Sequence, residues 1–214
     1  MKFQEEMTEL RKNTMDMANL TASMVKRSLG VLLDMDLEAA DRMVDDFIKV
    51  DRLDRRIEES AIRILTLYQP MASDMRAVAT YMKSITYMER IAKYCKNIAV
   101  ATHYLKDKPR YDVLECLRPM GETASEMVDI VINGLRNVTV EGFDQITEMD
   151  NILDNALRDD MRRIVDFITS CPESADVCTY YISVMKFLER IGDHACKIAE
   201  KVTFMVTGFH AIIE

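Results

Sequence analysis

The chain has 214 residues, 49% of them hydrophobic and 30% charged, a balance that excludes a disordered protein. Its net charge of −8 argues against nucleic acid as the main partner. No apolar run is long enough to span a bilayer and the start has no secretory signal pattern, so we expect a cytoplasmic protein. The five cysteines form no CxxC pair, which favours reduced, mostly buried thiols.

Hydrophobic residues in the first half follow a helical period. Over residues 3–31 they recur in steps of three and four, which is typical of a helix in a bundle, and Gly30 lies near its expected end. Asp36 is a suitable cap for a second helix that runs to about residue 67. Pro70 ends that helix, and a third is expected from residue 73 or 74 to about residue 105.

The second half repeats this arrangement after a polar linker at residues 106–109. Helical spacing predicts a fourth helix that breaks between Gly134 and Gly142. A fifth helix is expected over residues 146–168 and, after a break at 171–174, a sixth to about residue 209. The protein should therefore be all-α.

The last helices of the two halves also share strings of letters, at a constant offset of 100 residues. Tyr81 corresponds to Tyr181, and the Glu-Arg-Ile string of residues 89–91 returns at 189–191. Long helices joined by short turns pack antiparallel. The sequence thus predicts two tandem antiparallel three-helix bundles related by internal duplication, residues 1–107 and 108–214.

Two pairs of carboxylates mark the second half: Asp150 with Asp154, and Glu189 with Asp193, each pair four residues apart. Acids at this spacing on a helix repel each other at a cost of about 0.2–0.5 kcal/mol. Both pairs flank a buried stripe, and on antiparallel neighbouring helices all four side chains can converge. Oxygen-rich clusters of this kind bind Mg²⁺, Mn²⁺ or iron, so we predict a metal site; pairing with arginine or simple solvation are the alternatives.

The first half holds a weaker copy of this site. Asp51 and Glu89 remain, but Phe47 and Lys93 stand where the second half has acids. An apolar residue and a cation have replaced two potential ligands. Any metal bound by Asp51 and Glu89 should therefore be held more weakly.

The catalytic motifs of common enzyme classes are missing. None of the three histidines has a Glu three residues before it, which counts against a di-iron bundle. There is no glycine-rich phosphate loop, GxSxG or HExxH. His194 and Cys196 are two residues apart on one helix and cannot face each other, although His194 or Glu200 could add a metal ligand. We predict no catalytic residues.

These strings closely resemble the PhoU family, the accessory and regulatory proteins of phosphate-specific transport. The resemblance rests on Gln-Pro-Met-Ala-Ser-Asp-Met-Arg at 69–76, on Leu-Glu-Arg-Ile-Gly-Asp at 188–193, and on both repeats in order. It implies two three-helix bundles and a role in restraining phosphate uptake and the phosphate-starvation response. The Gln-Pro segment has decayed in the second repeat, at 171–176.

The same resemblance implies partners and a cofactor. The partners would be the ATPase subunit of the phosphate transporter and, where one exists, a sensor histidine kinase, so that the protein meets the membrane only through them. Its E(D)xxxD motifs, at 150–154 and 189–193 here, imply a divalent or multinuclear metal: iron, zinc, manganese or magnesium. We also expect a homodimer.

The resulting hypothesis is a non-enzymatic adaptor with a metal site in its second bundle. A metal-dependent helical-bundle enzyme, such as an oxidase, and a plain helical scaffold are the alternatives. Two further expectations concern single residues. Gly192 should mark the close approach of a neighbouring helix or a metal ligand, and Arg90 and Arg190 should pair with acids across helices.

Overall fold

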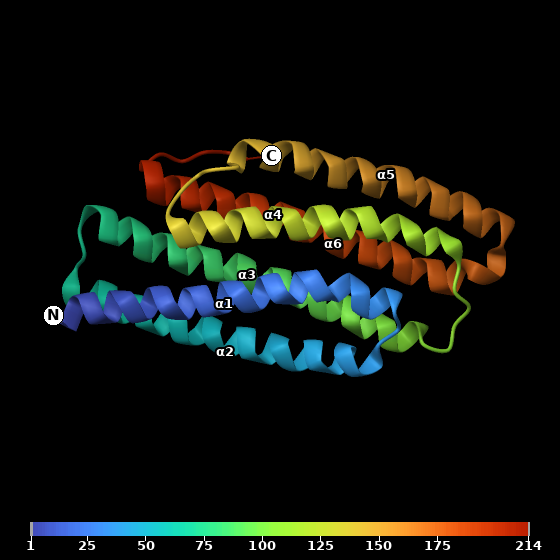
Figure 1. Cartoon of the computed structure of the whole chain (residues 1–214), viewed down its shortest axis with the longest axis horizontal. Coiled ribbons are helices and arrows are strands. Elements are labelled where there is room, and N and C mark those ends of the chain that lie inside the picture. Colours follow the sequence, from blue (N-terminus) through green and yellow to red (C-terminus); the bar gives the residue numbers. More distant parts are fainter. Residues whose placement is uncertain (1, 214) are drawn as a thin grey trace.

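The computed structural model describes residues 2–213, apart from the side chains of Val113 and Leu114. In this part of the chain, long α-helices joined by short connections account for nearly all of the structure (Figure 1). The long helices are α1 (Lys2–Leu33), α2 (Leu37–Tyr68), α3 (Ala72–Leu105), α4 (Leu117–Asn137), α5 (Ile146–Ser170) and α6 (Ala175–Thr207). Short 3₁₀ turns, η1 (Asp112–Cys116), η2 (Phe143–Gln145) and η3 (Pro172–Ser174), lie in the connections of the second half.

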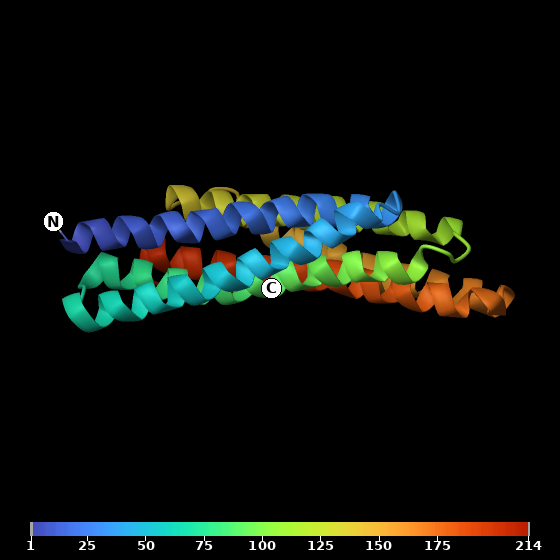
Figure 2. The ribbon, with the colours of Figure 1, turned by 90° about the horizontal axis from the view of Figure 1, so that it is seen from below.

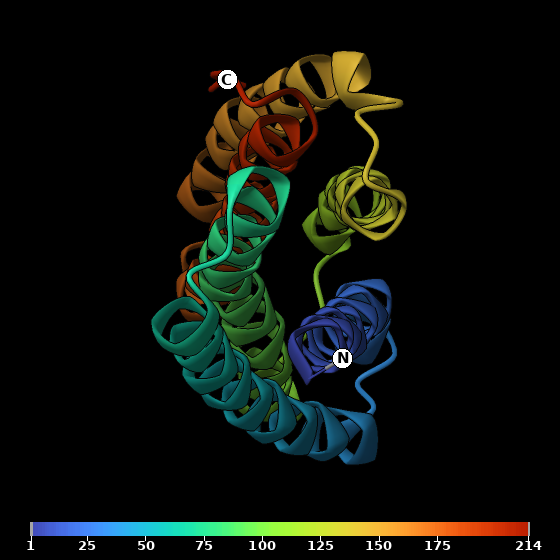
Figure 3. The same cartoon turned by 90° about the vertical axis from the view of Figure 1, so that its left-hand side faces the viewer.

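The helices form two three-helix bundles, α1–α3 and α4–α6, that lie side by side along their length (Figures 1 and 2). The end-on view shows a curved layer in the order α2, α3, α6, α5, with α1 and α4 together on its other side (Figure 3). This confirms the predicted all-α fold. The predicted division between residues 107 and 108 falls in the connection from α3 to η1.

Helix α3 meets α6 in an antiparallel contact that joins the bundles. Thr80 near the start of α3 donates a hydrogen bond to the carbonyl of Lys201 near the end of α6, over 3.1 Å. At the opposite ends, the rings of Tyr104 and Tyr180 stack with centroids 5.4 Å apart. Because polar and aromatic contacts run along the whole interface, the bundles are held in one register.

The ends of the helices follow local chemistry, with some departures from prediction. Asp36 caps α2 as expected, since its carboxylate accepts a hydrogen bond from the amide of Ala39 at 2.9 Å. Helix α1 continues past Gly30 to Leu33. Helix α3 begins at Ala72, ahead of the predicted cap residues, and no side chain caps it.

The stripe predicted on the last helix is buried. Leu188, Ile191, Ala195 and Ile198 are at most 1% exposed and belong to the hydrophobic core. All five cysteines are free thiols, and Cys95, Cys178 and Cys196 are buried. Within residues 2–213, no helix combines the length and the apolar character that a bilayer crossing requires.

Candidate metal-binding pocket

A pocket of about 540 Å³ opens where α5 and α6 meet α3 of the other bundle. Three of the four carboxylates predicted to meet, Asp150, Asp154 and Asp193, line it. The antiparallel packing of α5 on α6 therefore brings one acidic pair and Asp193 to a single pocket, while Glu189 lies outside its lining. The remaining lining residues are Tyr87, Arg90, Asn151, His194, Cys196, Lys197 and Ile213.

Gly192 allows the two acidic helices to approach closely. A Cβ at this position would lie 2.5 Å from Cδ1 of Leu153 and 3.4 Å from Oδ1 of Asp150. Both atoms belong to α5, so the missing side chain gives that helix its place against α6. The expectation of a close approach by a neighbouring helix is confirmed.

Glu189 lies beside the pocket, and the charges of the pocket acids act on its carboxylate. Burial, followed by repulsion from Asp193, raises the pKa of Glu189 to about 7, and Arg190 opposes the shift. The guanidinium of Arg190 lies 3.4 Å from Oε2 of Glu189 and 2.6 Å from Oδ2 of Asp193. Arg190 thus pairs with acids of its own helix, and the predicted pairing across helices is wrong for this residue.

Asp150 is a partly buried acid of the pocket. Burial raises its pKa, a hydrogen bond from the thiol of Cys196 opposes this, and the charges of Asp193 and Asp154 raise it further. Burial and the adjacent Asp150 also raise the pKa of Cys196 far above its usual range. The thiol therefore stays protonated beside the carboxylate.

His194 stands between aromatic rings of the other bundle. Tyr87 and Tyr94 each stack on its imidazole with centroids 5.8 Å apart. Burial, and then the charge of Arg90, lower the pKa of His194 to about 4. Both ring nitrogens are buried without a hydrogen-bond partner, so the imidazole is neutral and has lone-pair capacity to spare.

The chemistry of these donors fits a divalent cation. Three carboxylates, a neutral imidazole with an unused nitrogen, and a thiol surround one pocket. As they stand in the described part of the chain, no three acidic, thiol or imidazole groups are arranged to enclose an ion. The salt bridge from Arg190 to Asp193 would have to open for that carboxylate to become a ligand.

The matching place in the first bundle is filled differently. Phe47, at the position of Asp150, carries the ammonium of Lys96 over its ring at 4.7 Å from the centroid. Lys96 in turn corresponds to Cys196. Asp51 pairs with Arg55 at 2.9 Å, so this acid has a cation of its own helix as a partner.

Sequence reasoning missed several residues of the pocket. Cys196 and Lys197 follow Asp193 by three and four residues, and this spacing alone places them on its face. Tyr87 and Arg90 come from α3 of the other bundle, and no local sequence pattern predicts that they line this pocket. Ile213 reaches the pocket from the segment after α6. The sequence predicted a helix to about residue 209 and no structure beyond it.

Comparison with known proteins places this architecture in a family. The family model for the PhoU domain matches residues 14–102 and again residues 117–202. The chain belongs to the PhoU family. The two matched segments coincide with the two three-helix bundles, so each bundle is one PhoU domain.

Relatives of the PhoU family align over nearly the whole chain. A protein of Zymomonas mobilis is 32% identical over 96% of this chain and 87% of its own length. One of Rhizobium meliloti is 30% identical over the same shares. Both are named phosphate-specific transport system accessory protein PhoU homolog.

Solved PhoU structures share the fold. The crystal structure of PhoU from Pseudomonas aeruginosa superposes with a TM-score of 0.92 at 25% identity, covering 97% of this chain and 100% of that one. The Streptococcus pneumoniae phosphate transport system regulatory protein PhoU gives a TM-score of 0.87 at 24% identity, over 98% and 99% of the two chains. The side-by-side bundles are therefore the PhoU arrangement.

Proposed function

We propose that this protein is a non-enzymatic regulator of phosphate uptake and of the phosphate-starvation response. It would act as a cytoplasmic adaptor on the ATPase subunit of a phosphate transporter and, where one exists, on a sensor histidine kinase. The observation that carries the proposal is full-length similarity to proteins named as accessory to phosphate-specific transport, at up to 32% identity. That similarity spans both bundles, so it covers the whole adaptor.

The second bundle would hold a divalent or multinuclear metal through Asp150, Asp154, Glu189 and Asp193. The pocket lined by Asp150, Asp154 and Asp193 and the raised pKa values of Asp150 and Glu189 support this, because a bound cation relieves burial and repulsion that disfavour the charged carboxylates. The bound metal would supply positive charge to balance the carboxylates and tie α5 to α6. Asp51 and Glu89 would contribute little, since Phe47 and Lys93 stand where the second bundle has Asp150 and Asp193.

Metal analysis of matched variants tests the site. The purified protein is loaded with Mn²⁺, desalted and measured for bound metal, alone and as Asp154→Ala plus Asp193→Ala. We expect the double variant to lose its metal. Asp51→Ala plus Lys93→Ala changes the corresponding positions of the first bundle and should retain it. Equal metal content in all three proteins would refute the site.

A binding measurement tests the adaptor role. The protein is immobilised and challenged with the purified ATPase subunit of the phosphate transporter from the same genome, with the ATPase of an unrelated importer as control. We expect selective retention of the phosphate transporter's subunit. Equal retention of both, or of neither, would contradict the proposal.

The same materials separate the two alternative functions. A metal-dependent enzyme would consume O₂ in the presence of Fe²⁺, and the double variant would lose that turnover. A plain scaffold would bind no metal, and chelation would leave its thermal stability unchanged. The proposed adaptor predicts bound metal without turnover.

A further inference from the structure

The segment that follows α6 folds back on the helix. Gly208 ends α6 in the left-handed conformation, with φ of 79°, and reverses the chain. Two residues later, the ring of His210 stacks on Phe204 with centroids 4.4 Å apart and planes 3° apart. We call residues 209–213 the strap, because they run from the end of α6 back toward the pocket.

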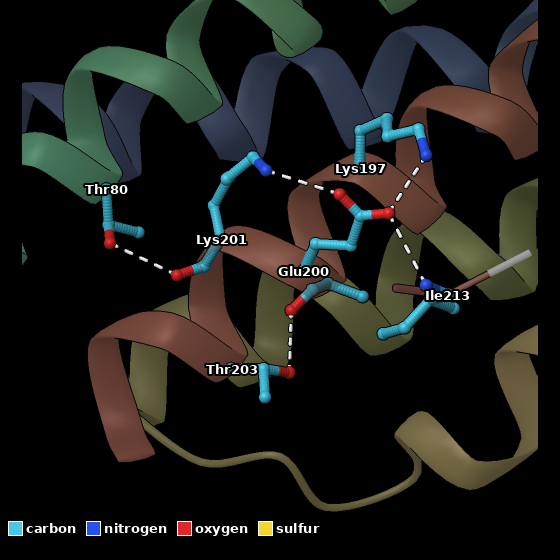
Figure 4. A network of polar contacts seen from close by, with 7 residues as sticks. Thr80, Lys197, Glu200, Lys201, Thr203 and Ile213 are labelled. Carbon is cyan, nitrogen blue, oxygen red and sulfur yellow. Dashed lines mark hydrogen bonds and ion pairs between the residues drawn. The ribbon is translucent and has the colours of Figure 1, made fainter. Parts of the chain in front are cut away.

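A buried carboxylate anchors the far end of the strap. The amide of Ile213 donates a hydrogen bond to Oε1 of Glu200, over 3.4 Å, as Figure 4 shows. Glu200 is only 7% exposed and also accepts from Lys197 at 2.9 Å and Lys201 at 3.2 Å. A buried carboxylate needs such donors, so Glu200 and the strap amide satisfy each other.

The anchored strap reaches the acidic pocket. Ile213 is part of the pocket lining, together with Asp150, Asp154 and Cys196. Lys197 lines the pocket as well and donates to the same carboxylate that holds the strap. One hydrogen-bonded cluster therefore connects the position of the strap to the wall of the pocket.

We infer that the strap gates the pocket, with the Ile213–Glu200 hydrogen bond as its latch. The inference rests on the proposed function for the identity of the gated ligand, a divalent cation. When the latch is closed, Ile213 covers the inner part of the pocket, where Cys196 is buried, while Asn151 and Asp154 at its mouth are already exposed. When the latch opens, the strap swings away from α6, so that Cys196 is reached from solvent and cation exchange becomes faster, while the bundles remain folded.

Two apolar side chains of the strap are exposed to solvent. Phe209 is 78% exposed and Ile212 is 81% exposed. If a bound cation favours the closed strap, the closed strap must favour the cation by the same factor, because coupling between two equilibria is reciprocal. The position of these two apolar side chains would then depend on whether the pocket is occupied.

Alkylation of Cys196 measures access to the pocket without any metal. The full-length protein is treated with N-ethylmaleimide at pH 8, and peptide mass spectrometry follows Cys196 and, as an internal control, Cys95 in the core of the first bundle. Ile213→Pro removes the latching amide, whereas Ile213→Ala keeps it. Ile212→Pro places proline at the neighbouring exposed position.

We expect Ile213→Pro to raise the alkylation rate of Cys196 about fivefold, the factor that corresponds to one lost hydrogen bond. Ile212→Pro should stay near the unaltered protein, Ile213→Ala should lie between them, and Cys95 should not change. Equal rates at Cys196 in every protein would overturn the gate. A parallel rise at Cys95, or equal effects of both proline variants, would do the same.

Release of Mn²⁺ into excess EDTA links the gate to the metal. Ile213→Pro should release Mn²⁺ about fivefold faster than the unaltered protein, for the same reason, and unchanged release from a protein with faster Cys196 alkylation would overturn control of the cation by the strap. If the unaltered protein binds no Mn²⁺, the metal site fails. The alkylation rates then decide the gate by themselves.

Discussion

Glu189 and Asp193 share one face of α6, but the fold buries them to different extents. The side chain of Glu189 is 14% exposed and that of Asp193 is 32% exposed, and burial before all else raises the pKa of Glu189 to about 7. Arg190 bonds to both, more closely to Asp193. The duplicate retains Glu89 and replaces the second acid with Lys93, so the better-sheltered acid is the one that both halves keep.

The pKa of Glu189 predicts a pH-dependent penalty on folding. The folded value lies above the unfolded one, so between about pH 4.5 and 7 the folded state binds more protons and stability falls as pH rises. Relative to Glu189→Gln, the metal-free protein should lose about 1 kcal/mol of its free energy of unfolding from pH 5 to pH 8. This loss is smaller than the full pKa shift implies, because the carboxylate is partly solvated. Urea unfolding at both values measures this, and a constant difference would contradict the pKa assignment.

Only part of the candidate site could be predicted from the sequence. The four acids were identified because helical spacing is a local property, visible in letters four apart. The protonated thiol of Cys196 and the neutral imidazole of His194 depend on burial created by α3 and α5. Burial of that kind is set by tertiary packing, so the sequence could name His194 as a possible ligand but could not predict the protonation state of His194 or Cys196.

At the scale of elements, two helical glycines have opposite roles. An added Cβ at Gly134 in α4 would lie 2.5 Å from the ring of Phe143 and 2.9 Å from the carbonyl oxygen of Thr139. At Gly30 in α1 nothing lies within 4 Å. The connection from α4 to α5 is therefore packed on Gly134, whereas Gly30 is free to be any helix former.

Alanine at these two positions should shift stability in opposite directions. Gly30→Ala should add up to about 1 kcal/mol to the free energy of unfolding through helix propensity. Gly134→Ala should lose about 1–3 kcal/mol, because the ring and backbone of the turn must move. Urea titration of both variants provides the comparison, and a gain at both positions would refute the close packing.

The end of α4 carries backbone strain. Val138 occupies the left-handed region with φ of 54°, which disfavours a β-branched residue, and it is 43% exposed. Val138→Gly should therefore stabilise the protein by about 1 kcal/mol. Val140→Gly, at an exposed site in the same connection, should not. Thermal melting compares them, and equal shifts would argue against strain at Val138.

Helix existence followed from the sequence, but helix ends did so only in part. Asp36 caps α2 as predicted because a cap is a local hydrogen bond. Helix α3 starts at Ala72 with a positive φ of 46° and no side-chain cap, a strained start that the sequence rules disfavour. The fold-back after Gly208 was not predicted, because it is held by a tertiary hydrogen bond to Glu200, which the sequence suggested only as a possible metal ligand.

At the scale of the whole molecule, aromatic contacts between α3 and α6 should make the bundles unfold together. The ring of Tyr94 stacks on Phe187 and on His194, both at 5.8 Å between centroids. Tyr94→Ala should cost about 2 kcal/mol, whereas Tyr104→Ala, at a site that is 59% exposed, should cost less. Far-UV circular dichroism should show one transition for the parent protein, and two separate transitions would disprove a single cooperative unit.

The duplication was visible in the letters, but the way in which its halves meet was not. The offset between Glu-Arg-Ile strings identifies equivalent helices without saying which ones touch. The pairing of α3 with α6 follows from side chains such as Tyr87 and Tyr94, whose partners lie on the other half. An antiparallel pairing of equivalent helices is what a pseudo-twofold axis perpendicular to the helices produces.

Because the two halves belong to one chain, equivalent positions can carry different residues. In a symmetric dimer of a single three-helix unit, every substitution appears twice, so Phe47 with Lys96 in one copy and Asp150 with Cys196 in the other could not coexist. Here one half places an ammonium over an aromatic ring, while the other half has an acidic pocket lined by Asp150 and Cys196. Covalent linkage has thus allowed two copies of one scaffold to carry different side chains at equivalent positions.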